Sequence, residues 1–155
     1  MNTSTTKTTP TPRHFWHTLT TTAHTHDIWK IWTDVSRWHH WDKGLQSSSL
    51  HGLFQKGTKG SLISLNGTVS QFMITEYQEG ISYTFATKLP LAQLHVKRTV
   101  FEQNNTVTFT HEVWFDGLLG WFFALLLGKN FMKMLPSVME EVREIAETSP
   151  SFHET

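Results

Sequence analysis

The chain has 155 residues, of which 38% are hydrophobic and 13% aromatic, and it contains no cysteine. Thirteen Lys and Arg residues balance thirteen Asp and Glu residues, so the formal net charge is zero and the basic surface needed for nucleic-acid binding is missing. Without cysteine there is neither a disulfide nor a thiolate nucleophile, and a chain of this length is expected to form one domain around one core.

The N-terminal segment is rich in Thr and Pro and has no apolar run. Such a composition cannot offset the entropy of ordering, so residues 1–12 are predicted to be a disordered tail, followed by one domain over 13–148 and a second tail over 149–155. No secretory signal is expected, and the longest apolar run, Leu118–Leu127, is too short to span a bilayer. The protein is therefore expected to be soluble and cytoplasmic, without stable insertion into a membrane.

Residues 14–22 are predicted to form a first strand, because they are β-branched and aromatic. A pair of short helices is predicted over 24–42, where apolar residues recur at spacings of three and four before a break at Asp34-Val35-Ser36. Indoles are unusually dense in this pair. An indole combines a large apolar area with one N–H group, so the pair is predicted to act as a lid over an apolar interior, with the lid residues Trp32, Trp38 and Trp41.

The middle of the chain alternates between short β-prone runs and turns that contain Gly, Pro or Asn. Short connections of this kind favour hairpins, and therefore an antiparallel meander. Six strands are predicted, at about 47–54, 59–65, 68–77, 80–88, 91–102 and 106–115.

Alternation within these strands predicts which side chains face the interior. The inward face is apolar, and it includes Val107, Phe109, Val113 and Phe115 on the last strand, Leu94, Val96 and Val100 on the strand before it, and Ile81, Phe85, Phe72 and Ile74 on earlier strands. Four polar side chains are predicted to share that face: Glu76, Tyr83, Arg98 and His111.

A long C-terminal helix is predicted over 118–147, with Gly128 and Pro136 as places for a kink. Its second half has one apolar stripe, whereas its first half is apolar all round and is expected to need cover on more than one side. Three interpretations stay open for Leu118–Leu127. The segment is a wall of the core and of a cavity, or an interfacial membrane contact through Trp121, Phe122 and Phe123, against which the expected basic face is missing apart from Lys129 and Lys133, or a protein–protein patch.

Together these elements predict an α+β fold, in which a seven-stranded curved antiparallel sheet wraps around the C-terminal helix, with two short helices after the first strand. The chain resembles the START-like, Bet v 1-like helix-grip superfamily (SRPBCC), and within it the polyketide cyclase/dehydrase and lipid-transport group. The residues that carry this resemblance over about 13–147 are Ile28-Trp29, Asp34-Val35-Ser36-Arg37-Trp38, Trp41-Asp42, the Phe54-x-x-Gly57-x-x-Gly60 hairpin, Thr110-His111 and Gly117. The resemblance implies a deep apolar cavity between the sheet and the last helix.

The inward polar residues are the candidates for chemistry. A buried charge without a partner costs several kcal/mol, so Arg98 needs a carboxylate, for which Glu76 is the candidate, or water, or an anionic ligand. One interpretation is that His111, Arg98 and Tyr83 orient a carbonyl or phenol group of a ligand. The other is that Arg98 lies near a strand end and reaches water, while His111 is a core histidine with its hydrogen bonds satisfied.

The expected ligand-binding residues are Phe72, Ile74, Tyr83, Phe85, Val96, Arg98, Phe109, His111, Val113, Trp121 and Leu125. No cofactor and no metal are expected, although the chain has ten histidines, because the dense spots at His24-x-His26 and His39-His40 lack converging ligands and carboxylate support. Nucleophile-elbow and phosphate-loop motifs are missing as well.

Two main functions follow as hypotheses. The first is a binding module that holds or carries a small hydrophobic molecule, such as a lipid, a polyketide or another aromatic compound. The second is a cyclase/dehydratase-like enzyme without metal or covalent nucleophile, with His111, Arg98 and Tyr83 as candidate catalytic residues. A third, an interaction domain with a collapsed cavity, is also open, and a fold alone does not decide among them.

Overall fold

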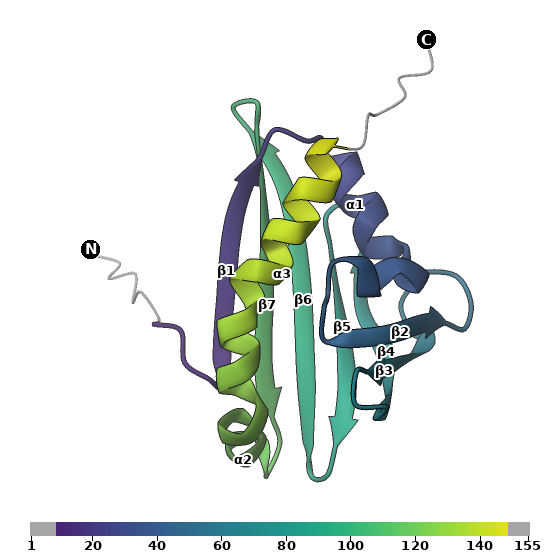
Figure 1. The fold of residues 1–155 in the computed structure, drawn as a ribbon, viewed down its shortest axis with the longest axis vertical. Coiled ribbons are helices and arrows are strands. Elements are labelled where there is room, and N and C mark those ends of the chain that lie inside the picture. The colour runs from purple at the N-terminus through teal and green to yellow at the C-terminus, as the bar shows by residue number, and fades with distance from the viewer. Residues whose placement is uncertain (1–8, 149–155) are drawn as a thin grey trace, which may run out of the picture.

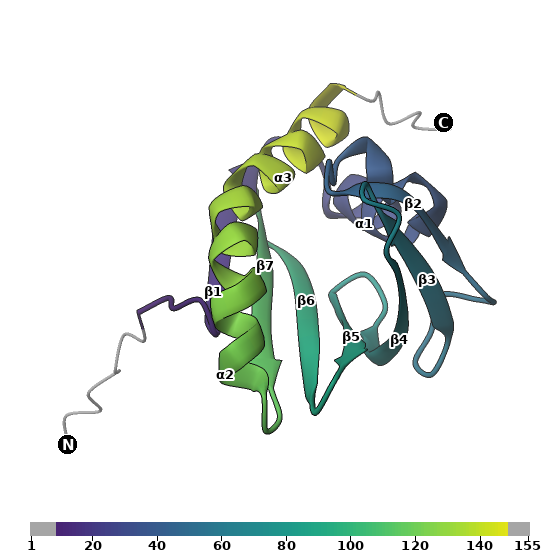
Figure 2. The ribbon, with the colours of Figure 1, turned by 60° about the horizontal axis from the view of Figure 1, so that its bottom comes forward.

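One antiparallel sheet forms the body of the computed structural model, which describes residues 9–148. Its seven strands lie in the order β1 (His14–Thr21), β7 (Thr106–Asp116), β6 (Ala92–Gln103), β5 (Ser82–Leu89), β4 (Val69–Gln78), β3 (Lys59–Ser64) and β2 (Leu45–Leu50). From β2 to β7 each strand pairs with the next along the chain, and β1 joins the far edge beside β7. The predicted seven-stranded antiparallel sheet, with its meander of six strands, is confirmed, and Figure 2 shows the sheet curving from β1 round to β3 and β2.

Two short helices connect β1 to β2, as predicted. The α-helix α1 (Thr25–Thr33) begins where a carboxylate oxygen of Asp27 accepts the His24 N–H at 3.2 Å, and the 3₁₀ helix η1 (Val35–His40) follows it directly. The break lies at Asp34, where the Ser36 hydroxyl donates to the Asp34 carboxylate at 3.0 Å. Ile28 and Trp32, one turn apart on α1, are fully buried and anchor this helix against the sheet.

The C-terminal helix lies on the concave face of the sheet, over β1 and β7 (Figures 1 and 2). It consists of α2 (Gly120–Phe123), a π-helical turn η2 (Ala124–Gly128) and α3 (Lys129–Thr148), with Pro136 inside α3. Leu135, Met139, Val142 and Ala146 are its buried face along α3. No helix within residues 9–148 combines the length and the hydropathy needed to cross a membrane.

The first half of this helix approaches the rest of the protein through small residues. A Cβ atom added to Gly128 would lie 2.1 Å from the Pro12 carbonyl oxygen, and one added to Gly120 would lie 3.3 Å from the Arg13 guanidinium. Ala124, between these two glycines, is buried. Close backbone packing therefore brings the helix onto the chain just before β1, and no larger side chain fits there.

Several predicted boundaries differ from the structure. The strand predicted at 47–54 is β2, which ends at Leu50, so Phe54 lies in the following connection. Residues 1–8 and 149–155 of the predicted tails lie outside the described residues. Thr11, which was placed in the N-terminal tail, exchanges two backbone hydrogen bonds with His14, at 2.9 and 3.0 Å.

A β-bulge in β4 overturns one predicted orientation. Ile74 pairs with Phe85 and Glu76 pairs with Thr84, so one extra residue is inserted into β4 at Thr75. Because the side-chain period of a strand is two, this insertion exchanges the faces beyond it. Tyr77 consequently pairs with Tyr83, whereas Glu76 is exposed. The prediction that Glu76 faces inward and pairs with Arg98 is wrong.

Candidate ligand-binding site

A row of polar side chains crosses the concave face of the sheet on four adjacent strands. Tyr83 of β5 pairs with Arg98 of β6, Arg98 pairs with His111 of β7, and His111 pairs with His17 of β1. Tyr83, Arg98 and His111 are 1%, 5% and 1% exposed. The structure thus brings the three predicted candidates together, side by side and buried, and the interpretation that Arg98 reaches water at a strand end is wrong.

Aromatic rings surround the Arg98 guanidinium. Its central carbon lies 4.8 Å from the ring centroid of Trp41, 4.9 Å from that of Trp38 and 5.3 Å from that of Phe85. None of the ion pairs found among residues 9–148 includes Arg98. Cation–π attraction, which strengthens when the cation is desolvated, therefore replaces the expected carboxylate.

One hydrogen-bonded chain connects Arg98 to the end of α1. Arg98 Nη1 donates to the Tyr83 hydroxyl, and the hydroxyl donates to the Trp32 backbone carbonyl at 3.4 Å. The Trp38 indole N–H donates to the same carbonyl at 2.9 Å. Trp32 lies in the last turn of α1, where helix carbonyls carry partial negative charge, so this end of the helix also stabilises the cation.

His111 is held neutral by its surroundings. Its ring centroid lies 5.4 Å from that of Trp32 and 6.2 Å from that of Trp41. Burial, first, and then the positive charge of Arg98 and the nearby His17 lower the pKa of His111 well below its ordinary value. The imidazole is therefore uncharged near neutral pH and can act as either a hydrogen-bond donor or an acceptor.

Unpaired nitrogens gather around Arg98 and His111. Among the described residues, the buried side-chain nitrogens without a hydrogen-bond partner are Trp32 Nε1, His39 Nδ1, Trp41 Nε1, Arg98 Nε and His111 Nε2. Apart from the His39 nitrogen, these atoms belong to Arg98, to His111, or to the indoles of Trp32 and Trp41, which pack against these two residues. The indole and guanidinium nitrogens can only donate, and each buried group left unpaired costs about 1–3 kcal/mol. The group is thus chemically suited to receive an oxygen acceptor.

Asp42 is the acidic group whose charge interacts with Arg98. Burial raises the pKa of the Asp42 carboxyl, while the Gly44 N–H and the charge of Arg98 act in the opposite direction. Its Oδ1 accepts the Gly44 N–H at 3.1 Å. In the sequence Asp42 carries only part of the family resemblance, although its position directly after Trp41, a predicted lid residue, is a usable signal.

The remaining predicted ligand-binding residues divide into two groups. Those on the sheet, Phe72, Ile74, Phe85, Phe109 and Val113, are buried on the concave face, and Val96 is half-buried. Those on the helix, Trp121 and Leu125, are 54% and 59% exposed. The first half of the C-terminal helix is expected from the sequence to be covered on more than one side, but no element within residues 9–148 covers these two side chains. Trp121 and Leu125 therefore do not line the interior with the other predicted ligand-binding residues.

The predicted lid residues fill the space over Arg98. Trp32, Trp38 and Trp41 are at most 1% exposed. Trp38 packs against Phe72 and Phe85, with centroids 5.5 and 5.3 Å away. The space expected to be a deep cavity thus contains the protein's own rings, because the indoles of η1 reach down to the sheet.

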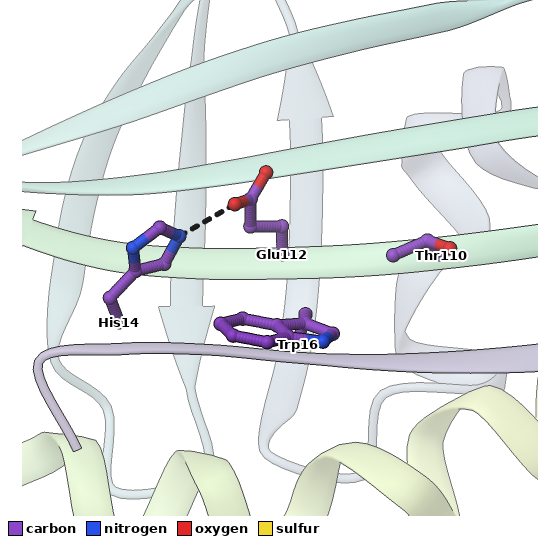
Figure 3. Close-up of a pocket in the computed structure, with 4 residues that line it drawn as sticks. All are labelled: His14, Trp16, Thr110 and Glu112. Atoms are coloured by element: carbon purple, nitrogen blue, oxygen red, sulfur yellow. Dashed lines mark hydrogen bonds and ion pairs between the residues drawn. The ribbon is translucent and has the colours of Figure 1, made fainter. Parts of the chain in front are cut away.

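The pocket found in the structure lies on the opposite, outer face of the sheet. It is a shallow hollow of about 310 Å³ lined by His14, Trp16, Thr110 and Glu112 of β1 and β7 (Figure 3). His14 Nε2 lies 2.6 Å from a Glu112 carboxylate oxygen, as the dashed line in Figure 3 marks. Since inward and outward residues alternate, the whole sheet separates this hollow from Arg98 and His111. Within residues 9–148, no three His, Asp or Glu side chains are arranged to hold a metal ion.

A seven-stranded curved antiparallel sheet that holds a long C-terminal helix defines a Bet v 1-like helix-grip protein. The chain belongs to the polyketide cyclase/dehydrase and lipid transport family, whose model matches residues 13–147. No curated protein matches the chain in sequence.

Solved structures share this fold at low identity. Protein MLL2253 from Mesorhizobium loti is 11% identical, with a TM-score of 0.72 over 90% of this chain and 100% of that one. Norcoclaurine synthase from Thalictrum flavum, in complex with dopamine and hydroxybenzaldehyde, is 10% identical, with a TM-score of 0.68 over 89% and 88% of the two chains. Ara h 8.0201 is 11% identical, with a TM-score of 0.69 over 88% and 98%. At these identities the likeness shows the fold alone.

Proposed function

We propose that the protein binds and carries a small hydrophobic molecule, and that an oxygen atom of this molecule accepts hydrogen bonds from the polar group at Arg98 and His111. Membership of a family described by polyketide cyclisation and lipid transport supports ligand binding in general. The concave face supplies apolar rings for the body of the ligand, which is a lipid, a polyketide or another aromatic compound.

The observation that carries this proposal is the set of unpaired donors. Trp32 Nε1, Trp41 Nε1 and Arg98 Nε are buried without acceptors. A carbonyl, phenol or carboxylate oxygen that reaches any of these nitrogens would satisfy a group that is costly to leave unpaired. A site of this type discriminates strongly against a ligand that lacks the oxygen.

Binding requires the lid residues to move. Trp38 and Trp41 occupy the space over Arg98, so a ligand can reach the donors only when η1 shifts away from the sheet. Besides the indole bond to Trp32, η1 is held by the Ser48 hydroxyl, which donates to the Val35 carbonyl at 2.5 Å. Opening would also expose the buried Trp38 and Trp41 rings, so the free energy of ligand binding has to offset that cost.

Matched probe molecules test the proposal. Naphthol and naphthoic acid carry an oxygen acceptor, whereas methylnaphthalene has a similar shape and none. The two oxygen-containing probes should raise the melting temperature by mass action. At a ligand concentration a hundredfold above Kd, the free energy of unfolding rises by about 2.7 kcal/mol, and methylnaphthalene should have a far smaller effect. Native mass spectrometry of protein purified from its own host should detect a co-purified oxygen-containing molecule.

Two outcomes would contradict the proposal. Equal shifts of the melting temperature with all three probes would contradict the role of the donors. No shift with these probes, or with fatty acids, sterols and flavonoids, would contradict ligand binding.

The enzyme hypothesis has one specific observation in its favour. The unprotonated His111 lies directly beside the cationic Arg98, so its imidazole can accept a proton from a substrate whose developing negative charge the guanidinium stabilises; its lowered pKa makes it a weak base, so the reaction depends on that stabilisation. His111→Gln should then abolish turnover of an aromatic polyketide substrate while ligand binding persists. Retained turnover in this variant would exclude His111 as the catalytic base.

A further inference from the structure

One end of the molecule carries an exposed apolar surface that no other element covers. Trp121 and Leu125 are 54% and 59% exposed, and they lie beside other exposed apolar side chains at the start of the C-terminal helix and at the β5–β6 turn. We name this surface the terminal patch; it consists of Leu91, Leu118, Trp121, Phe122, Leu125 and Leu126. Figures 1 and 2 show α2 and the β5–β6 turn at the same end of the sheet.

The two segments of the terminal patch are held together by the backbone. The Leu119 N–H donates to the Leu91 carbonyl at 3.0 Å. Gly117 has φ +92, and a Cβ atom there would lie 2.7 Å from Ala92 Cα, so the chain turns tightly against the β5–β6 turn. The patch is therefore a fixed part of the fold.

The outward orientation of these residues follows from the way the helix packs. Gly128 packs against Pro12 and Gly120 lies near Arg13 and the Phe115 backbone, Ala124 between them is buried, and the contact at Gly128 is too close for any side chain. The large residues between them are left on the other sides of the helix. The same close packing that docks the helix thus exposes its indole, phenyl and leucine side chains.

Two lysines follow the patch along the helix, and the acidic residue beside the patch, Asp116, is paired with His95. Between Asp116 and Glu140 the sequence contains Lys129 and Lys133 but no Asp or Glu. Both lysines are exposed, and they continue the line of Trp121 and Leu125 along the helix at spacings of four residues. The surface therefore offers apolar side chains and positive charge, without the carboxylates that would pair the lysines.

We propose that the terminal patch binds reversibly to the surface of a membrane that contains anionic lipids. Trp121, Phe122 and Leu125 would enter the boundary between headgroups and acyl chains, where aromatic side chains are favoured, and Lys129 and Lys133 would contact lipid phosphates. A second copy of the chain fits less well, because residues 117–139 contribute two lysines and no Asp or Glu, so this segment offers no charge complementarity to itself. The proposal does not depend on ligand binding at Arg98.

Vesicle flotation tests this proposal on the full chain. The protein should float with vesicles of phosphatidylcholine mixed with phosphatidylserine, and much less with phosphatidylcholine alone. Each lysine near an anionic surface changes partitioning by about fivefold, so Lys129→Glu with Lys133→Glu should weaken binding by more than about tenfold. The matched control is Lys56→Glu, an exposed lysine in the β2–β3 connection, which should leave flotation unchanged.

The apolar contribution is tested with Trp121→Ser and Leu125→Ser against Leu53→Ser and Leu65→Ser, which change leucines that are exposed elsewhere. Only the first pair should reduce flotation. Because the chain has no cysteine, Leu125→Cys provides one labelling site, and an environment-sensitive dye there should shift to the blue with anionic vesicles, whereas the same dye on Leu65→Cys should not. Absence of flotation with anionic vesicles would overturn the proposal. Sedimentation equilibrium that shows a dimer disrupted by Trp121→Ser, together with absent flotation, would assign the patch to self-association instead.

Discussion

Arg98 and His111 lie directly opposite each other in the register of β6 and β7, and both side chains are buried on the concave face of the sheet. A permanent positive charge next to a titratable ring disfavours protonation of that ring, and burial acts in the same direction. As a result, the cationic Arg98 and the neutral His111 lie side by side in the interior and contact the aromatic rings of the lid residues.

The pairing predicts how stability depends on pH. Since the pKa of His111 in the folded protein lies well below its ordinary value of 6.5, the unfolded chain binds a proton below pH 6.5 that the folded chain does not bind. The contribution of the neutral His111 to the free energy of unfolding is therefore complete above pH 6.5. It is lost as the pH falls below that value, by up to about 1.4 kcal/mol per pH unit. Urea unfolding of the wild type and of His111→Phe between neutral and weakly acidic pH measures this slope.

The difference between the two proteins isolates His111. The raised pKa of Asp42 has the opposite effect. Because this carboxyl group stays protonated more readily in the folded state, the protein loses stability as the pH rises above 3.8, the pKa of the group in the unfolded chain. Asp42 is present in both proteins, so its contribution largely cancels. Identical slopes in the two proteins would show that His111 is not held neutral.

Arg98→Met is expected to preserve or increase stability while it weakens the binding of oxygen-containing ligands. The buried Arg98 guanidinium carries a desolvation cost that none of the ion pairs found among residues 9–148 offsets, and a hydrophobic residue of similar volume in its place removes that cost. Urea unfolding and thermal shift with naphthoic acid measure the two effects separately. Lys97→Met, on the neighbouring residue of β6 that faces outward, serves as the control for binding. Strong destabilisation by Arg98→Met would show that the cation–π contacts outweigh the desolvation cost.

Tyr83→Phe is expected to destabilise the protein by about 1–3 kcal/mol, because it leaves Arg98 Nη1 buried without the hydroxyl that accepts its hydrogen bond. The hydroxyl also connects the sheet to the end of α1 through the Trp32 carbonyl. Tyr77→Phe is the matched control: none of the hydrogen bonds found in the described residues uses the Tyr77 hydroxyl, so its removal should change the urea midpoint little. Equal effects of the two substitutions would argue against the Arg98–Tyr83 bond.

Gly128→Ala is expected to destabilise the protein, although alanine normally stabilises a helix by about 1 kcal/mol relative to glycine. The new Cβ atom would meet the Pro12 carbonyl oxygen at 2.1 Å, so the helix would have to move away from the chain before β1, at a cost of about 1–3 kcal/mol. Ser137→Ala, at an exposed position in α3, should change stability by less than about 0.5 kcal/mol. The sign of the change at Gly128 in thermal unfolding therefore reports whether this close packing exists.

The sequence alone was sufficient for the architecture and for the inward direction of most of the candidate residues. Strand alternation has a period of two, so the burial of Phe109 predicts that His111 lies on the same face, and the turn signals divide the chain into hairpins whose order follows from short connections. The same local rules identified α1 and η1 from the spacing of their apolar residues.

What the tertiary structure decided depends on contacts between segments far apart in the chain. The bulge at Thr75 moved Glu76 to the outside, and nothing local announces one inserted residue. The register between β5, β6 and β7 placed Tyr83, Arg98 and His111 in one row. The packing of Gly128 against Pro12 turned Trp121 and Leu125 outward, because the side of a uniformly apolar helix that becomes buried is chosen by the surface on which it docks and not by its own periodicity.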